Sequence, residues 1–390
     1  MFRRVYLDNA ATTKVDERVF EAMRRSLTDQ FGNPSSIHAF GQEAKMAVDR
    51  ARHQIAEILH AAPNEITFTS GGTESNNLAI RGICQRHSPG GGHIIISAIE
   101  HPAVKAPAEA LQDLGFEISK AGAGTNGRVD PSEIAELIRP DTVLISVMLA
   151  NNEIGTLQPL REIAGLVSKE RASRENRQKI FLHTDAVQAL GKIPIDVLEL
   201  GCDLLTISAH KIYAPKGVGV LWAKRGVRLA AQNLGGNQER GFRGGTENVP
   251  GIVAFGKACE LAASSIETET TEILGLRTRF ESAVLERIPG SSINGDSEAR
   301  IPNISNIAFE NVDGEGLLIN LDMQGIAVST GSACSSGSIE ASPVLLALGQ
   351  DEKRARSAIR FSFGRFNTSE DVDYVLERLP GAIETLRKLA

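Results

Sequence analysis

Residues 180–211 read IFLHTDAVQALGKIPIDVLELGCDLLTISAHK, and this stretch decides the expected fold. Its two apolar runs, residues 180–184 and 204–208, have the length of strands in a sheet that is covered on both faces. Similar runs occur earlier and later, at residues 66–69, 94–97, 142–148 and 218–223. Helix-like segments separate them, at residues 73–86, 103–114, 132–138 and 160–171. Alternating strands and helices predict an α/β fold with a mostly parallel sheet.

The chain also has room for a second domain. Its 390 residues exceed what one hydrophobic core usually supports. After the α/β pattern we expect a long helix at residues 255–288, weakened at Gly275. Strands are expected at residues 304–309 and 358–362, and helices are expected to begin near residues 313 and 369. We therefore expect a large α/β domain over residues 15–255. A smaller α+β domain is expected to combine residues 1–14, which cross back to it, with residues 256–390.

Composition narrows the class of protein. The net charge is −6 and 42% of the residues are hydrophobic, without a basic stripe that could neutralise nucleic-acid phosphates or a membrane surface. The start of the chain lacks the apolar region of a signal peptide, and no apolar run reaches 18 residues. We therefore expect a cytoplasmic protein without membrane or direct nucleic-acid partners. The polar insert at residues 168–179 is expected to be an exposed loop or helix end.

The four cysteines divide into two kinds. None forms a Cys-x-x-Cys pair, and no metal site is expected. Cys84, Cys202 and Cys259 lie in apolar contexts and are expected to be buried. Cys334 stands in the small, polar stretch STGSACSSGS (residues 329–338) and is the candidate nucleophile. A surface loop with an incidental cysteine is the alternative.

Polar side chains follow the ends of the two strands quoted first. Lys211 comes three residues after one strand, and Asp185 comes directly after the other, with Gln188 three residues on. In open α/β sheets, ligands bind beyond the carboxyl ends of the strands. A carboxylate facing a lysine suits pyridoxal phosphate (PLP), whose pyridine nitrogen it keeps protonated. Gln188 would hydrogen-bond the phenolic oxygen of the ring, and a helix cap is the alternative for Asp185.

A phosphate site is expected where the strand at residues 66–69 turns into a helix. Gly71 and Gly72 allow close approach of the backbone, and the free N–H groups of the helix start attract an anion. The Thr73 hydroxyl can donate as well. No Walker-type nucleotide loop occurs, since the nearest stretch, APKGVG at residues 214–219, lacks its Gly-Lys-Ser/Thr ending.

Three further side chains complete the candidate site. His101 follows a strand end and could stack on a planar cofactor, move protons and activate Cys334. Asn152 follows another strand end. Arg360 lies in an otherwise apolar strand, where it is expected either to grip a substrate carboxylate or to form a structural ion pair. It is the convergence of these groups on one sheet edge that predicts a site.

Seven motifs together resemble the cysteine desulfurase family, which includes the housekeeping and nitrogen-fixation desulfurases. That family belongs to the fold-type I PLP enzymes related to aspartate aminotransferase. The motifs occur in the family's order and cover nearly the whole chain: YLDNAATT (6–13), FGNPSSIH (31–38), TSGGTESNN (69–77), NNEIG (151–155), HTDAVQ (183–188), SAHK (208–211) and GSACS (331–335).

The resemblance implies a PLP-dependent conversion of L-cysteine to L-alanine. It makes Lys211 the Schiff-base lysine, Cys334 the cysteine that forms the persulfide, and His101 the stacking residue. The remaining cofactor contacts would come from Gly72, Thr73, Asn152, Asp185, Gln188, Ser208 and His210, and from Thr246 of a partner subunit. Asn152 and Arg360 would take the substrate carboxylate.

The resemblance also implies partners: a homodimer with shared sites, and an acceptor protein for the sulfur. The sulfur would serve iron–sulfur cluster assembly or tRNA thiolation, and Cys334 is also a candidate cluster ligand in a scaffold complex. The short stretch after the last expected helix and the insert at residues 168–179 leave the acceptor open. Gly72 also stands where the family often has alanine. The alternatives are a selenocysteine lyase, an aminotransferase or an epimerase of the same fold, or a sulfur-relay scaffold without turnover.

Overall fold

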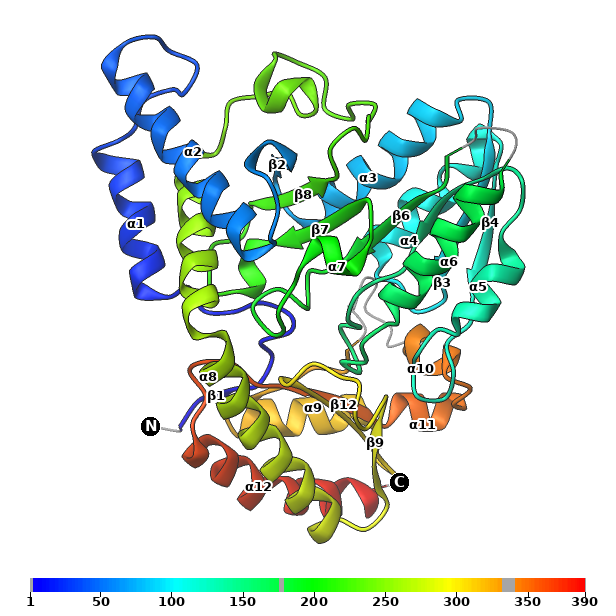
Figure 1. Cartoon of the computed structure of the whole chain (residues 1–390). Coiled ribbons are helices and arrows are strands. Elements are labelled where there is room, and N and C mark those ends of the chain that lie inside the picture. The colour runs from blue at the N-terminus through cyan, green and yellow to red at the C-terminus, as the bar shows by residue number, and fades with distance from the viewer. Residues whose placement is uncertain (1–2, 175–178, 332–340, 390) are drawn as a thin grey trace.

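The computed structural model describes residues 3–174, 179–331 and 341–389. Its centre is a seven-stranded sheet with the order β2-β8-β7-β6-β5-β3-β4 (Figure 1). These strands are β2 (Ile66–Thr69), β3 (Gly92–Ser97), β4 (Phe116–Ala121), β5 (Thr142–Ser146), β6 (Phe181–Asp185), β7 (Leu204–Ser208) and β8 (Gly219–Ala223). β8 runs antiparallel to both its neighbours, and the other neighbouring pairs are parallel. The predicted α/β fold with a mostly parallel sheet is confirmed.

Helices cover both faces of this sheet. α3 (Gly72–His87) and α4 (Pro102–Glu109) share one core with Ile94 and Leu144, whereas α2 (Ala39–Ile58) and α6 (Leu160–Ser173) share another with Ile95 and Ile145. Successive side chains of a strand point to opposite faces, which explains this division. The short helices η1 (Pro63–Glu65), α5 (Pro131–Leu137), α7 (Val197–Leu200) and η4 (Gln238–Gly241) lie in the connections.

One prediction about this layer needs correction, and one strand was not predicted. The expected helix at residues 103–114 is two pieces, α4 and the 3-10 turn η2 (Gln112–Leu114). The chain turns between them at the buried Leu111, and η2 is terminated by Gly115, whose φ is +83°. β4 was not predicted. It is an edge strand with exposed Glu117 and Lys120, so its apolar signal is weak.

One long helix, α8 (Val249–Arg287), joins the two hydrophobic cores (Figure 1). It is continuous through Gly275, and it begins before the expected residue 255. Its first part packs with α1 (Glu17–Thr28) and α2 in the core of the large sheet, and its last part belongs to a second core. Among the described residues, α8 alone is long and apolar enough to cross a membrane. Half of its most apolar stretch is buried inside the protein.

The second core belongs to a smaller α+β unit. Its antiparallel sheet has the order β12-β10-β9, built from β9 (Ser291–Asn294), β10 (Ile304–Phe309) and β12 (Ala358–Ser362). Its helices are α9 (Gly314–Met323), α10 (Pro343–Ala347), α11 (Glu352–Arg356) and α12 (Ser369–Arg387). The N-terminal strand β1 (Val5–Tyr6) pairs with β11 (Ile326–Ala327), so the chain does cross back to this unit. The expected division at residue 255 falls inside α8, and the domain limits stay a prediction.

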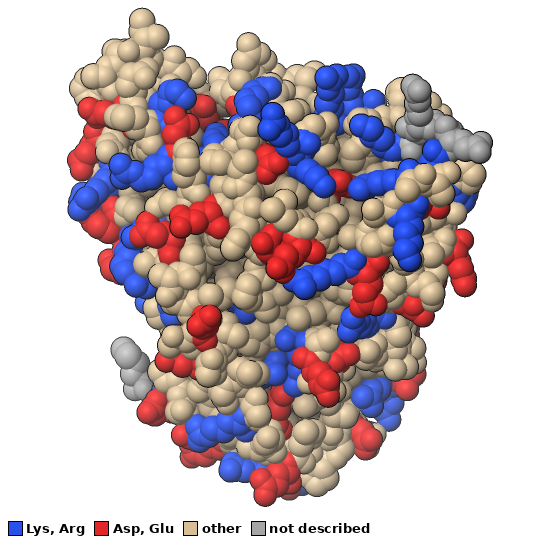
Figure 2. Space-filling view, in the orientation of Figure 1, with Lys and Arg blue, Asp and Glu red and all other residues tan. Residues whose placement is uncertain are grey.

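The described part of the polar insert is a helix end with specific contacts. α6 continues to Ser173, and residues 175–178 lie outside the described residues. Arg171 forms an ion pair with Asp203 and donates to the carbonyl of Ile180, at 2.9 Å from Nε. This arginine therefore ties the helix end to β6 and does not simply face water. Over the face shown in Figure 2, acidic and basic side chains are interspersed.

Candidate functional site

The carboxyl ends of the parallel strands surround a pocket of about 240 Å³. Nine of the residues predicted from the sequence line it: Gly72, Thr73, His101, Asn152, Asp185, Gln188, Ser208, His210 and Lys211. Asp185 and Ser208 are the last residues of β6 and β7, and the others come from the segments that follow β2, β3, β5, β6 and β7. This is the sheet edge at which α/β proteins bind ligands.

Lys211 lies in the 3-10 turn η3 (Ala209–Lys211), which begins where β7 ends. Its Nζ donates to the carbonyls of Ala10 and Ala11, both at 2.6 Å. Burial, together with the positive charge of Arg360, lowers the pKa of Lys211 to about 8. A lowered pKa leaves more of the amine uncharged near neutral pH, which is the form that attacks a carbonyl carbon.

Asp185, at the end of β6, accepts two hydrogen bonds. The backbone N–H of Val187 donates to Oδ1 at 3.0 Å, and the side-chain amide of Asn76 donates to Oδ2 at 2.7 Å. The amide of Gln188 donates to the carbonyl of Ala10 at 3.0 Å, the same carbonyl that holds Lys211. The backbone of the N-terminal segment thus holds two of the side chains that line the pocket.

The start of α3 forms a tight cradle. A Cβ atom at Gly72 would lie 3.0 Å from a methyl carbon of Val187, so a larger residue would crowd the pocket wall. His210 stands nearby, with its Nδ1 3.2 Å from the hydroxyl of Thr12. Burial, together with the charges of the neighbouring Lys211 and Lys216, lowers the pKa of His210 to about 4. The ring is therefore neutral at physiological pH and can donate one N–H to an anion.

His101 is the N-cap of α4, and its Nδ1 accepts from the backbone N–H of Ala103 at 3.1 Å. This contact places the proton of a neutral ring on Nε2. Desolvation lowers the pKa of His101, and the charges of Lys211 and Lys105 act in the same direction against Asp185. The neutral ring can therefore donate a hydrogen bond from Nε2, while its Nδ1 lone pair is taken by the backbone N–H of Ala103.

Sequence reasoning missed a buried carboxyl group beside this histidine. Glu100 is 1% exposed, and its Oε1 accepts from Ser97 Oγ at 2.6 Å and from Met148 N at 2.7 Å. Burial raises the pKa of Glu100 to about 8. These bonds join the carboxyl ends of β3 and β5. Asn76 and the carbonyls of Ala10 and Ala11 were missed as well, although they lie in the quoted motifs TSGGTESNN and YLDNAATT.

Arg360 lies on β12 and is 4% exposed. It donates to Asp8 Oδ1 at 2.8 Å and to the backbone carbonyl of Asn152 at 2.9 Å. The ion pair with Asp8 is the structural alternative that the sequence allows. Among the described residues, the Nε of Arg360 has no hydrogen-bond partner.

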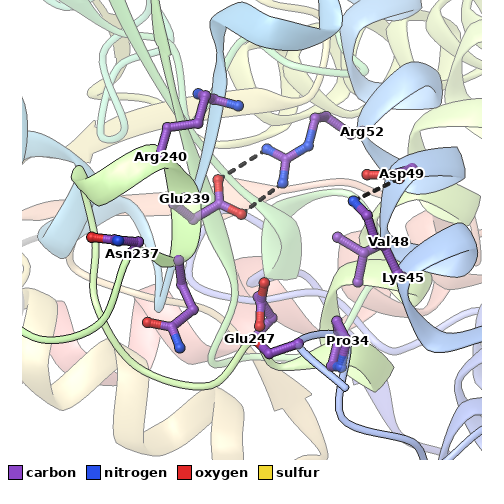
Figure 3. A pocket seen from close by; sticks show the side chains of 11 residues that line it. Pro34, Lys45, Val48, Asp49, Arg52, Asn237, Glu239, Arg240 and Glu247 are labelled. Atoms are coloured by element: carbon purple, nitrogen blue, oxygen red, sulfur yellow. Dashed lines mark hydrogen bonds and ion pairs between the residues drawn. The ribbon is translucent and has the colours of Figure 1, made fainter. Parts of the chain in front are cut away.

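Thr246 lies apart from this pocket. It lines a separate hollow of about 90 Å³ with residues that include Thr69, Ser70 and Asn248. The stretch before it is held through Glu239, which accepts from Arg52 at 2.6 and 2.9 Å (Figure 3). Glu239 also accepts from the backbone N–H of Phe68 at 2.9 Å. Within the described chain, the pocket at Lys211 does not include Thr246.

The three cysteines that the structure describes follow the expectation. Cys84, Cys202 and Cys259 are free and buried, as predicted. Burial raises the pKa of all three thiols, that of Cys202 to about 12, which makes them poor nucleophiles. Cys334 lies outside the described residues.

The fold is that of a fold-type I PLP-dependent transferase. A model of the aminotransferase class-V family matches residues 5–375. "Cysteine desulfurase IscS" of Dictyoglomus turgidum is 47% identical over 100% of this chain and 97% of its own length. "Cysteine desulfurase IscS 1" of Archaeoglobus fulgidus is 47% identical over 99% of this chain and 98% of its own. A solved structure titled "NIFS-LIKE PROTEIN" has a TM-score of 0.91 and 37% identity, covering 98% of this chain and all of that one.

The chain therefore belongs to the class-V aminotransferase family and, within it, to the cysteine desulfurases. The resemblance noted in the motifs is confirmed. These relatives do not favour the alternative activities.

Proposed function

We propose that the protein binds PLP in the pocket at Lys211 and uses it to take sulfur from L-cysteine. The observation that carries this proposal is the meeting of three groups in one pocket: the amine of Lys211, the carboxylate of Asp185 and the N-terminus of α3. The pocket fits PLP, because Gly72 has no side chain to crowd the start of α3 and Asp185 lines the pocket as a partner for the ring nitrogen. When bound, PLP draws electrons from the carbon atoms of the substrate.

Each residue has a part in holding the cofactor and the substrate. Lys211 would bond the cofactor, Asp185 and Gln188 would hold its ring, and His101 would cover one face. The phosphate would lie on Gly72, Thr73, Ser208 and His210. Asn152 and Arg360 would take the carboxylate of cysteine, for which Arg360 would exchange part of its pairing with Asp8.

The sulfur step is assigned to Cys334. Its thiolate attacks the sulfur atom of the bound cysteine, so that an S–S bond forms as the C–S bond breaks. The electrons of the broken bond stay on the Cβ atom of the substrate. This carbon takes a proton, and the product leaves as alanine. One thiol of cysteine and one of the enzyme thus give alanine and a persulfide, without an outside oxidant. The buried thiols of Cys84, Cys202 and Cys259 suit this role poorly.

A homodimer with shared sites accounts for the position of Thr246. Because Thr246 lies outside the pocket of its own chain, it is free to contact the phosphate of a second copy. Three large apolar side chains outside the pocket are also exposed: Phe31 at 66%, Ile37 at 94% and Leu234 at 87%. A second copy would shield such side chains from water.

The remaining parts of the proposal concern the setting. We propose a cytoplasmic enzyme that passes its sulfur to an acceptor protein, for iron–sulfur clusters or for tRNA thiolation. Cys334 could then also ligate a cluster inside a scaffold complex. Residues 1–14 and 256–390 would form the smaller domain, which carries the segment with Cys334.

The function is tested by incubating purified protein with PLP and L-cysteine and measuring alanine and persulfide sulfur. Lys211→Ala should fold, as circular dichroism can show, yet lose alanine formation. The proposal fails if wild-type protein forms no alanine, or if Lys211→Ala forms it at the wild-type rate.

A further inference from the structure

Asp185 is held by a side chain that the proposed function does not use. Asn76 is fully buried on α3 and lines the pocket. Its Nδ2 lies 2.7 Å from Asp185 Oδ2, while the backbone N–H of Val187 holds Oδ1. The carboxylate is thus gripped at both oxygens by neutral N–H donors, so its plane is fixed.

The other end of the Asn76 amide shows what sets its orientation. Its Oδ1 is buried and has no hydrogen-bond partner within the described part of the chain. A turned amide would place that oxygen against the carboxylate oxygen of Asp185, where two acceptors repel each other. The Asn76 amide therefore turns its nitrogen toward Asp185, although this leaves its oxygen without a hydrogen bond. The contact with Asp185 sets the orientation of the amide.

The position of Asn76 along α3 adds a second role. It lies one helical turn after Gly72 and Thr73, the start of the helix that would hold the phosphate. A single rigid helix therefore connects the phosphate cradle with the carboxylate that would meet the ring nitrogen. The bond from Asn76 to Asp185 fixes the distance between these two ends of the pocket.

We propose that Asn76 is a positioning residue for the cofactor, which orients Asp185 and keeps it at a fixed distance from the start of α3. This inference rests on the proposed binding of PLP. Asn76 acts through Asp185 and need not touch the substrate.

The experiment compares two ligands on the apoprotein, without turnover. One is PLP, and the other is its deaza analogue, in which carbon replaces the ring nitrogen. Only PLP can use Asp185, whereas both ligands use the phosphate cradle and Lys211. The ratio of their dissociation constants therefore reports the contact at Asp185 and cancels general effects on folding.

Asn76→Leu removes the donor at nearly constant volume, and Asn76→Ala does so without added bulk. The matched control is Asn77→Leu at the next position of α3, where the Asn77 side chain bonds the carbonyl of Thr73 and not Asp185. Wild-type protein and Asn77→Leu should prefer PLP over the analogue. In both Asn76 variants this preference should fall by roughly tenfold, as for a lost hydrogen bond to a charged group.

The outcomes separate the two proposals. If either folded Asn76 variant keeps the wild-type preference, Asn76 does not position Asp185, and the proposed function stands. If wild-type protein binds neither ligand, the proposed function itself fails. A preference that falls equally in Asn77→Leu also overturns the inference, because the effect would then belong to α3 as a whole.

Discussion

The ion pair between Arg52 and Glu239 should carry a large share of the stability of the loop that holds Thr246. The two side chains are 13% and 2% exposed, and they meet through two hydrogen bonds (Figure 3). Arg52→Met would leave the carboxylate of Glu239 buried, with the backbone N–H of Phe68 as its remaining donor. Breaking one side of a buried pair typically costs about 3–5 kcal/mol.

A neighbouring surface pair supplies the control. Lys45 and Asp49 lie at 3.3 Å on the same helix, α2, but their side chains are 54% and 48% exposed. Lys45→Met should lower the free energy of unfolding by only about 0.3–0.5 kcal/mol, since water already solvates both charges. The double variant Arg52→Met, Glu239→Gln should be more stable than Arg52→Met, because no buried charge is left without a partner.

The assay is urea unfolding of the protein, followed by circular dichroism, with the midpoints compared at a constant slope. Arg52→Met should shift the midpoint far more than Lys45→Met does. Equal shifts for these two variants, or a double variant less stable than Arg52→Met, would refute the reasoning from burial.

Three further predictions concern the chemistry. Cys334→Ser should still bind cysteine, seen as a change in the absorbance of bound PLP, but should lose alanine formation, while Cys202→Ala keeps it; the opposite pattern would remove Cys334 from the mechanism. Because burial lowers the pKa of Lys211 to about 8, uptake of PLP by the apoprotein should accelerate up to about that pH and then level off. A rate that keeps rising toward the ordinary lysine pKa of about 10.4 would contradict this. Finally, mixing Thr246→Ala protein with Lys211→Ala protein should give more activity than either variant shows alone. In a mixed dimer, one site combines an intact Lys211 from one subunit with an intact Thr246 from the other. No gain of activity on subunit exchange would place Thr246 in the site of its own chain.

Local sequence determined the architecture of the sheet and much of the pocket. Short apolar runs with helices between them fix a parallel sheet, and the carboxyl ends of parallel strands necessarily share one edge. Lys211, Asp185, His101 and Asn152 could therefore be assigned to one site from their places after strands. The edge strand β4 was not predicted, because its exposed polar side chains interrupt the apolar pattern of a strand.

Only the tertiary structure decided which groups complete that pocket. The carbonyls of Ala10 and Ala11 reach Lys211 across about 200 residues of chain, and a backbone carbonyl leaves no mark on sequence. Asn76 stood in a predicted helix, but its contact with Asp185 depends on how α3 packs against β6. The same holds for Arg360, whose pairing with Asp8 needs the N-terminal segment to lie beside β12. Periodicity reports which face of an element is buried, whereas the partner of a buried polar group is set by packing between distant segments.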